Sequence, residues 1–391
     1  MALSKKVNLF LSKYLFYLYL VLFPFGVLIK LRIGISDGEA ISVNLIDILV
    51  FVIAVVTLFS NKKFPKFFYY IASLLFASMI GYVIFFEKLT PVQHFRGLMY
   101  LIRLTSYTLF FVYVFNLILQ KKISRDKLID YLISLSLAVS IFGLVQYFFI
   151  PDLRDLMYVG WDDHLYRLVS TYLDPTYTGI IITFGALLVL YLLKLRKLQY
   201  LPVFIVLIVA LFLTYSRASY IAFIVGAATL FTSKKYFYLF LVVFMVILLL
   251  LPRREGFGVR LERTHSIFAK FGNYSQTYQL FKKSPLFGVG FNNICSFRTL
   301  GFNDDPNSHA CSGSDSQILT ILATTGIFGL LLFITLIIKM YSNISKSDYS
   351  NAFKACSLAL LVHSSFSNSL FYPFVIGFYF CLLAINVKAG N

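Results

Sequence analysis

Apolar runs of membrane-spanning length alternate with short polar connections along the whole chain of 391 residues. A bilayer core about 30 Å thick is crossed by a helix of about 20 apolar residues. Because backbone groups in lipid must pair within their own segment, these runs predict helices. Twelve spans are predicted, over residues 8–29, 43–60, 66–86, 97–119, 128–150, 176–193, 200–215, 217–232, 235–252, 315–338, 353–367 and 371–387.

The longest polar segment, residues 253–314, lies between the ninth and tenth predicted spans. Its stretch 264–283 carries apolar side chains near helical spacing, which predicts an amphipathic helix. Pro285 is expected to end that helix, since the residue before a proline avoids the helical region. Long ordered loops are typically functional. The apolar positions of the stretch are Ile267, Phe271, Tyr274, Tyr278 and Phe281.

These patterns predict an all-α polytopic membrane protein with about 12 transmembrane helices, forming a single integral membrane domain over residues 1–391. The composition agrees, because 59% of the residues are hydrophobic and 13% are charged, with a mean hydropathy of +0.81. Soluble globular proteins are about 25% charged. We interpret the net charge of +18 as a topology signal plus an anionic ligand, and not as a surface for nucleic acid.

Lysine and arginine are segregated between the two sides of the predicted bundle. The short connections on one side are rich in lysine, as in "NKKFPK" at 61–66 and "KKISRDK" at 121–127. The positive-inside rule makes this side cytoplasmic, and an even number of spans places both termini there. Of the 13 arginines, only Arg125 and Arg196 lie on it. The others are Arg32, Arg96, Arg103, Arg154, Arg167, Arg217, Arg253, Arg254, Arg260, Arg263 and Arg298.

The outer arginines predict an anion site on the extracytoplasmic face, because a planar guanidinium suits phosphate and carboxylate. Arg217 lies in "LTYSRASY", between two predicted spans with almost no connection. A charge costs about 2.5–3.5 kcal/mol at a helix centre and less near an interface. Ser216 and the N-terminus of the next helix offer further donors to a phosphate. The alternative is an arginine that snorkels to the interface.

Two further polar stretches lie at the predicted outer ends of spans. In "YRLVSTYLDPTYTGI" (166–180), Arg167 is a candidate ligand contact, and Asp174 before Pro175 is interpreted as a helix N-cap. In "SHACSGSDSQ" (308–317), His309 and Asp315 precede an apolar span. Either side chain can remove a proton from a substrate hydroxyl, and an N-cap is the simpler role for Asp315.

Glycine and cysteine give less specific signals. Gly288 and Gly290 in "SPLFGVGFNN" allow a tight turn or a re-entrant segment, and they are a weak signal for a phosphate loop. Cys295 and Cys311 share the polar loop and are either a disulfide or two thiols. The sequence shows no metal-type Cys/His spacing and no nucleotide motif, so we expect no metal and no cofactor.

The order of these stretches resembles the O-antigen polymerase and O-antigen ligase superfamily of bacterial membrane glycosyltransferases. "LTYSRASY" is similar to its Ser-Arg stretch, and "KKSPLFGVGF" (282–291) to its Pro-Leu-x-Gly-x-Gly stretch. "STYLDPTYTG" (170–179) is similar to the stretch that opens its sixth span, and "GLVQYFF" (143–149) has the same character. The resemblance covers most of the chain, including the large loop between the ninth and tenth spans.

The resemblance implies metal-independent glycosyl transfer on the outer face of the bacterial cytoplasmic membrane. Donor and acceptor would be oligosaccharides on undecaprenyl pyrophosphate, set among membrane lipids, and a chain-length regulator would be a further partner. The resemblance assigns the pyrophosphate to Arg217 and to Arg260 or Arg263, with Lys270 a weaker candidate. Arg167 joins them from its position in the sequence. Asp315, or else His309, would be the general base.

The two branches of the superfamily differ near the tenth span. The ligase branch has a histidine, then Asn, Ser or Gln, nine residues and Gly-x-x-Gly. Gly326 and Gly329 fit this pattern, and Asp315 occupies the histidine position. The resemblance therefore favours an O-antigen, capsule or exopolysaccharide polymerase over ligation of the finished glycan to lipid A-core.

Two alternatives of other classes stay open at this point. A transporter or flippase predicts ionisable residues deep within the spans. His363 is the clear mid-span candidate, whereas Asp47 and Asp130 lie near predicted helix ends. A purely structural envelope protein is the other alternative, and it leaves the outer arginines unexplained.

Overall fold

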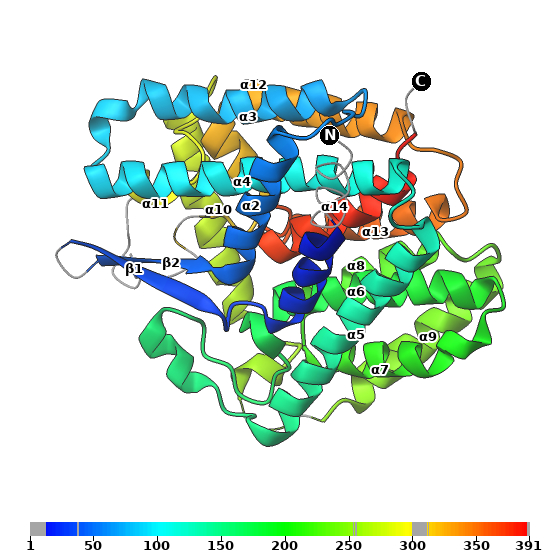
Figure 1. Cartoon of the computed structure of the whole chain (residues 1–391). Helices are drawn as coiled ribbons and strands as arrows, with labels where there is room; N and C mark the ends of the chain where they lie inside the picture. The colour runs from blue at the N-terminus through cyan, green and yellow to red at the C-terminus, as the bar shows by residue number, and fades with distance from the viewer. Residues whose placement is uncertain are drawn as a thin grey trace.

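The computed structural model describes residues 13–36, 39–252, 254, 256–298, 311 and 313–388, and most of them are helical (Figure 1). Each of the twelve predicted segments contains a helix. These helices are Lys13–Phe25 (which ends in the short η1, Phe23–Phe25), α2 (Leu45–Leu58), α3 (Phe68–Ile84), α4 (Pro91–Leu119), α5 (Arg125–Phe149), α6 (Pro175–Lys194), α7 (Leu201–Leu213), α8 (Arg217–Ala228), α9 (Lys234–Leu250), α12 (Gln317–Ser342), α13 (Ser350–Ser364) and α14 (Pro373–Asn386).

Shorter elements connect these helices. The predicted loop helix is present as α10 (His265–Lys283) and is followed by α11 (Ile294–Phe297). Short 3-10 helices lie at η2 (Phe86–Lys88), η3 (Arg154–Val159), η4 (Ser170–Tyr172), η5 (Leu198–Tyr200) and η6 (Phe257–Val259).

An antiparallel hairpin of β1 (Lys30–Ser36) and β2 (Glu39–Asn44) was not predicted. Leu31, Ile33, Ile41 and Val43 alternate with small or polar residues, which is the period of a strand. The hairpin is the one β-sheet among the described residues.

Four helices are long and apolar enough to cross a membrane by length and composition: α4, α5, α6 and α12. Six shorter helices are also apolar, among them α2, α3 and α14. A protein with this many apolar helices is a membrane protein. That all twelve segments cross the bilayer, and that residues 253–314 lie outside it, stay predictions.

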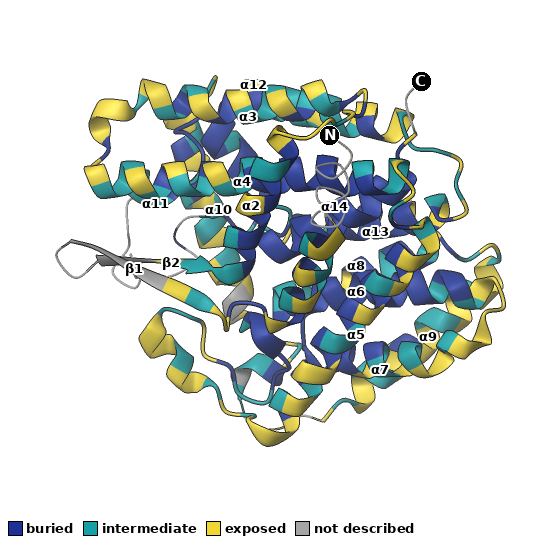
Figure 2. Ribbon diagram, viewed as in Figure 1, coloured by how far each residue is buried: buried dark blue, intermediate teal, exposed yellow. Residues whose placement is uncertain are grey.

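The helix α14 forms the centre of the bundle, and every one of its residues is buried (Figure 2). It packs against α4, α5, α6 and α13. A helix that is apolar on all sides belongs in an interior. Aromatic rings fill the contacts: the centroid of Phe378 lies 5.4 Å from that of Phe184 in α6, and Phe380 lies 5.4 Å from Phe111 in α4.

A break in α12 joins two of the sequence stretches. Gly326 has φ 65° and ψ −167°, which interrupts the helix. The carbonyls of Ala323 and Thr324 then accept hydrogen bonds from Val289 N and Gly290 N, at 2.8 and 3.0 Å. A Cβ on Gly326 would lie 2.2 Å from the carbonyl oxygen of Leu286. The glycines of both stretches therefore serve close backbone pairing. That the segment around Gly288 and Gly290 re-enters the membrane stays a prediction.

Candidate functional site

The tight turn between α7 and α8 holds Arg217 against the large loop. Ser216 caps α8, because its Oγ accepts from Ser219 N at 3.4 Å. Arg217 Nη1 donates to the carbonyl of Leu261 at 3.3 Å and to that of Arg263 at 3.0 Å. The guanidinium of Arg217 thus lies against the backbone of Arg263. The family resemblance assigns both residues to one anion site, and that role stays a prediction.

Arg167 approaches the same turn from the other side. Its Nε donates to Thr214 O at 3.1 Å and its Nη2 to Tyr215 O at 3.4 Å, and the side chain is buried. Two consecutive carbonyls before α8 are therefore occupied by one arginine, while the first residue of α8 is another arginine. This arrangement brings Arg167 and Arg217 together at one end of the bundle.

Arg263 completes a group of three guanidinium groups. Its Nη1 donates to the carbonyls of Gly258 and Arg260, at 2.6 and 2.9 Å. Burial, followed by the positive charges of Arg167 and Arg217, lowers the pKa of Arg263 to about 10. Arg263 remains protonated at neutral pH, so the group carries three positive charges that repel one another. Such a group is stabilised by an anion.

His164 is a member of this group that the sequence analysis missed. It is 4% exposed, and neither ring nitrogen has a hydrogen-bond partner among the described residues. Burial, followed by the charges of Arg167 and Arg263, lowers the pKa of His164 to about 3. A neutral imidazole with unpaired nitrogens beside two guanidinium groups can donate to an anion. The only sequence signal was its position three residues before Arg167, in "DDHLYR".

Asp315 lies at the start of α12, and its carboxylate is accessible. Its side chain is 40% exposed, and Oδ1 lies 3.2 Å from Lys270 Nζ of α10. The N-cap of α12 is Ser316, whose Oγ accepts from Leu319 N. The N-cap interpretation of Asp315 is therefore wrong by one residue, and the Asp315 carboxylate is left for another role. Asn273 Oδ1 fixes the segment by accepting from Asp315 N at 2.9 Å.

Asp162 is close enough to both Arg167 and Asp315 to interact with their charges. It interacts electrostatically with Asp174, Arg167 and Asp315. Asp174 is the N-cap of α6, as predicted, and its Oδ1 accepts from the backbone N–H groups of Thr176 and Tyr177 at 2.6 and 2.9 Å. The sequence candidates Arg167, Arg217, Arg263, Lys270 and Asp315 therefore belong to one region.

His363, the mid-span histidine of the transporter alternative, lies in the last turns of α13 and is fully buried. Its Nε2 lies 3.2 Å from Ser219 Oγ, and its Nδ1 lies 2.6 Å from Ser369 Oγ. Both ring nitrogens are paired, so His363 ties α13 to the N-terminal turn of α8, where Arg217 lies. These contacts are those expected of a residue that holds two helices in place against each other.

Backbone strain is concentrated around the arginine group. Tyr166, Ser170, Leu173 and Tyr215 have positive φ values, of 52°, 54°, 55° and 50°. Each lies within three residues of Arg167, Asp174 or Arg217. Left-handed conformations of such residues cost about 1–3 kcal/mol each and cluster at functional sites.

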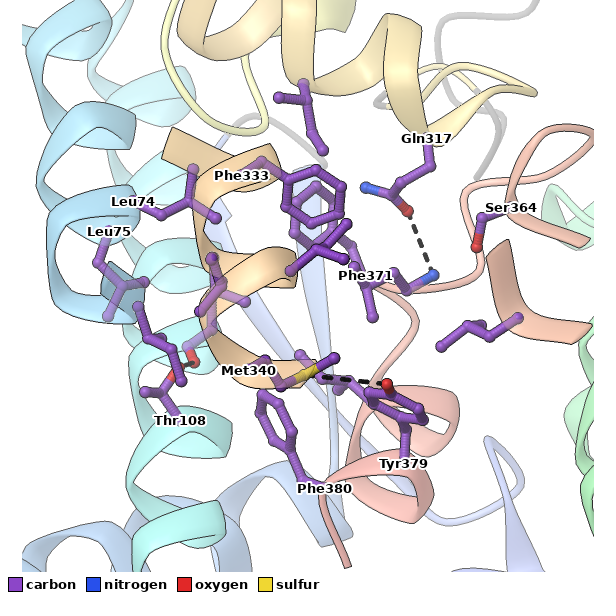
Figure 3. A pocket seen from close by; sticks show the side chains of 18 of the residues that line it. Leu74, Leu75, Thr108, Gln317, Phe333, Met340, Ser364, Phe371, Tyr379 and Phe380 are labelled. Carbon is purple, nitrogen blue, oxygen red and sulfur yellow. Dashed lines mark hydrogen bonds between the residues drawn. The ribbon is translucent and has the colours of Figure 1, made fainter. Parts of the chain in front are cut away.

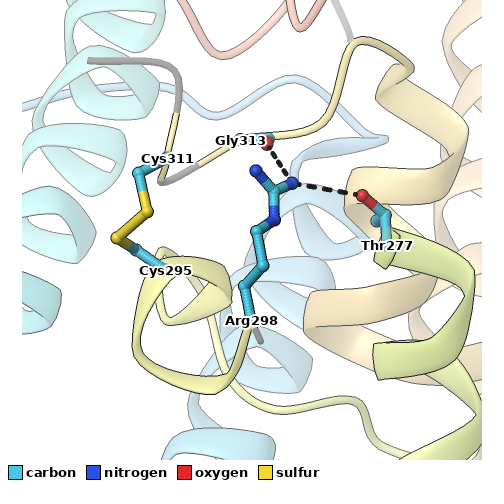
Figure 4. The surroundings of a disulfide bond; sticks show 5 residues. All are labelled: Thr277, Cys295, Arg298, Cys311 and Gly313. Carbon is cyan, nitrogen blue, oxygen red and sulfur yellow. Dashed lines mark hydrogen bonds between the residues drawn. A yellow bond between two sulfur atoms is a disulfide. The ribbon is translucent and has the colours of Figure 1, made fainter. Parts of the chain in front are cut away.

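The remaining candidates are placed as follows. Arg260 is exposed, and its carbonyl accepts from Arg263. His309 lies outside the described residues. Cys295 and Cys311 form a disulfide, close to Arg298, whose Nη2 donates to Thr277 Oγ1 and to Gly313 O (Figure 4). The described residues contain no group of three or more His, Cys, Asp or Glu side chains placed to hold a metal ion.

Comparison with known proteins identifies part of the chain. Residues 202–334 match the family model described as O-antigen ligase. This match confirms the resemblance to the O-antigen polymerase and ligase superfamily. The matched segment runs from α7 to α12 and contains Arg217, Arg263, Lys270 and Asp315. No curated protein matches the chain. The match supports the general class of the O-antigen polymerases and ligases, whose members are membrane glycosyltransferases.

Proposed function

We propose that the chain is an O-antigen, capsule or exopolysaccharide polymerase that joins repeat units carried on undecaprenyl pyrophosphate. The observation that carries the proposal is the contact of the Arg217 guanidinium with the backbone of Arg263, beside the buried Arg167. Three guanidinium groups at one end of an apolar helical bundle fit a lipid diphosphate, which is the anionic leaving group of such a donor.

The chemistry follows from the charge of that leaving group. The bond between the anomeric carbon of the donor glycan and the diphosphate oxygen breaks, and negative charge gathers on the diphosphate. Fixed guanidinium groups stabilise that charge without reorganising, as donors do in an oxyanion hole. The anomeric carbon forms its new bond to a hydroxyl oxygen of the acceptor glycan.

We assign to Asp315 the role of the general base that removes the proton of the acceptor hydroxyl. This carboxylate is 40% exposed and is held 3.2 Å from Lys270 Nζ. A general base must be within hydrogen-bond reach of the proton it removes, and Asp315 lies in the same electrostatic region as the arginines. Lys270 would orient the carboxylate. His309 is the second candidate for this role.

Ligation of the finished glycan to lipid A-core is the second candidate function, favoured by the description of the matched family. The aspartate at the position where the ligase branch carries histidine supports polymerisation instead. An Asp315→Ala strain separates the two. A polymerase defect leaves single repeat units on the lipid, whereas a ligase defect leaves long lipid-linked polymer that never reaches the core.

The site is proposed to face the exterior of the bacterial cytoplasmic membrane, with both termini in the cytoplasm. The Lys-rich connections on the opposite side support this orientation. The disulfide Cys295–Cys311 lies in the same loop as Arg263. Disulfides persist in oxidising compartments outside the cytoplasm, which supports an external loop.

The test is extension of a purified lipid-linked repeat unit by the purified full-length protein. Arg217→Ala is expected to lower the rate of glycosidic bond formation by about 100- to 1000-fold, as loss of one transition-state donor does. Arg154→Gln is the matched control, because Arg154 is an exposed arginine paired with Asp152 at 2.6 Å. Equal rates for wild type and Arg217→Ala would refute the role of this arginine. Transbilayer movement of the lipid without any glycosidic bond would instead identify a flippase.

A further inference from the structure

A second charged cluster lies outside the arginine group, between α2 and α4. Arg103 Nη1 lies 3.7 Å from Asp47 Oδ2, and the Arg103 guanidinium carbon lies 4.2 Å from the ring centroid of Tyr100. Asp47 is well supplied with donors, because its carboxylate also accepts from Tyr107 OH at 3.1 Å and from Asn44 Nδ2 at 3.3 Å. Asp47 therefore has three partners, whereas Arg103 has one long contact with a carboxylate.

Arg103 presents its remaining N–H groups to a crevice. Its side chain is 26% exposed, whereas that of Asp47 is 7% exposed. The crevice is lined by Arg103, the rings of Tyr100 and Tyr107, and residues at the start of α14, including Pro373. A guanidinium with one long contact to a carboxylate and an aromatic face beside it has unused donors for an anion.

The crevice adjoins a larger cavity. Leu104, Phe291, Phe371 and Ile376 line both. The cavity has a volume of about 160 Å³ and lies between α3, α4, α12, α13 and α14. Figure 3 shows its walls, with Leu74 and Leu75 from α3, Phe333 and Met340 from α12, and Tyr379 and Phe380 from α14.

The walls of the cavity are mostly apolar, with Gln317 at one end and Tyr379 toward the other (Figure 3). Gln317 Oε1 accepts from Leu370 N at 3.2 Å. Gln317 follows Asp315 by two residues, so this end of the cavity is next to the proposed general base. Ile318 and Leu361 also line the cavity and are 44% and 49% exposed, so it opens to the surface of the bundle.

An amphiphile with an anionic head and a long hydrocarbon chain matches this combination of a cation, an apolar cavity and an opening toward lipid. We propose that Arg103 binds the diphosphate of a second polyprenyl-linked substrate, the acceptor, whose isoprenoid chain lies in the cavity. The inference rests on the proposed function, because a polymerase binds two lipid diphosphates at once and the Arg217–Arg263 pair holds one. The acceptor glycan then starts beside Asp315, which removes its proton.

The two diphosphate positions are separated by the segment before α14. Tyr372 interacts electrostatically with both Arg103 and Asp174, and its ring stacks on Tyr177 with centroids 3.9 Å apart. The hydroxyl of Tyr372 has no hydrogen-bond partner among the described residues. This segment therefore lies between the Arg103 position and the Asp174–Arg167 position.

The experiment measures how many molecules of undecaprenyl diphosphate, without glycan, bind to the full-length protein in nanodiscs, by native mass spectrometry and by titration. Wild type is expected to bind two. Arg103→Gln is expected to retain one and to weaken the other on the order of 10- to 100-fold, as loss of a hydrogen bond to a charged group does. Arg217→Ala is expected to lose the complementary site, and Arg154→Gln is expected to bind as wild type does.

A second variant separates anion binding from a structural ion pair. Removing only Arg103 leaves Asp47 charged and unpaired, which destabilises a buried site. Arg103→Gln combined with Asp47→Asn removes both charges. If the pair serves only folding, this double variant regains the second binding site; if Arg103 binds the diphosphate, the double variant folds and still binds one molecule.

Three other outcomes are decisive. One molecule bound to wild type, or two bound to the Arg103 variants, overturns the second site and leaves the proposed function intact. Complete absence of binding to wild type counts against the proposed function itself. Displacement of the second molecule by phosphatidylglycerol at equal concentration shows that the site takes any anionic lipid, which also overturns the assignment to the acceptor.

Discussion

At the scale of single residues, the contacts of Arg217 predict that lysine does not suffice at position 217. Arg217 Nη1 donates to the carbonyls of Leu261 and Arg263. The loop therefore fixes the orientation of the guanidinium plane. A lysine ammonium is a point charge on a flexible stem and cannot both bind these carbonyls and present a planar fork. We therefore expect anion binding at this site to depend on geometry as well as on charge.

Arg217→Lys tests this point, because the substitution keeps the charge. We expect the rate of glycosidic bond formation to fall about 10- to 100-fold, since charge-assisted bidentate contacts are lost. The loop should remain in place, which limited proteolysis between residues 256 and 264 would report. Full activity of Arg217→Lys would mean that charge alone is sufficient.

His164 gives a prediction about pH. The pKa of His164 in the folded protein, about 3, lies below the ordinary histidine value of 6.5. Between these values the unfolded chain binds a proton that the folded protein does not, so stability falls as the pH falls below about 6.5. Relative to His164→Gln, wild type should lose about 1.4 kcal/mol of unfolding free energy per pH unit. Melting temperatures of the two proteins in detergent from pH 7.5 to pH 5 measure this, and parallel curves would contradict it.

At the scale of elements, the two glycine stretches are halves of one structure. The broken helix α12 and the segment 285–290 exchange backbone hydrogen bonds because Gly326 and Gly288 have positive φ, of 65° and 67°. A Cβ on Gly288 would lie 2.3 Å from the carbonyl carbon of Thr324. The pairing joins the end of the large loop to the helix that begins beside Asp315.

Gly288→Ala is therefore expected to be strongly destabilising, because both the backbone conformation and the contact exclude a side chain. We expect a loss of at least about 2 kcal/mol of unfolding free energy. Gly272→Ala is the matched control, since Gly272 lies in α10 with no atom within 4 Å of a Cβ. Alanine there should be neutral or stabilise the helix by about 0.5–1 kcal/mol. Similar melting temperatures for the two variants would contradict the pairing.

Local sequence patterns predicted most of the helices, but they could not predict contacts between residues far apart in the sequence. Apolar periodicity gave the twelve helices and α10, and "LDP" gave the N-cap Asp174. The extension of α4 back to Pro91 was missed, although Thr90 caps it with Gln93. His164 and Arg103 were not singled out, because their significance depends on buried neighbours from other elements. Spacing along the sequence does not show which partners burial will leave unmatched.

At the scale of the whole molecule, several of the charged and titratable residues described above lie outside the segment that the family model matches. The match covers residues 202–334. Arg103 and Asp47 lie before it, as do His164 and Arg167, and His363 lies after it. The matched segment contains Arg217, Arg263, Lys270 and Asp315, and the segments outside it contribute the buried His164, Arg167 and His363.

The segregation of lysine and arginine also predicts the orientation of the whole molecule. Positive residues in short connections are retained in the cytoplasm, so the connection between α12 and α13 should be inside and α10 outside. Lys346 is exposed in the first of these, and Ser275 is exposed in α10. The native thiols are silent in this test, because Cys356 and Cys381 are buried and Cys295 is bonded to Cys311.

Ser275→Cys and Lys346→Cys can therefore be compared with a membrane-impermeant maleimide. In spheroplasts we expect the cysteine at position 275 to react and the one at position 346 to be protected, and after lysis both should react. The second condition is the control for reactivity of each thiol. Reaction at position 346 in intact spheroplasts would place the Lys-rich side outside and the arginine group in the cytoplasm. A lipid-linked glycan already moved to the outer leaflet could not reach the arginines in that orientation, so the proposed function would fail with the topology.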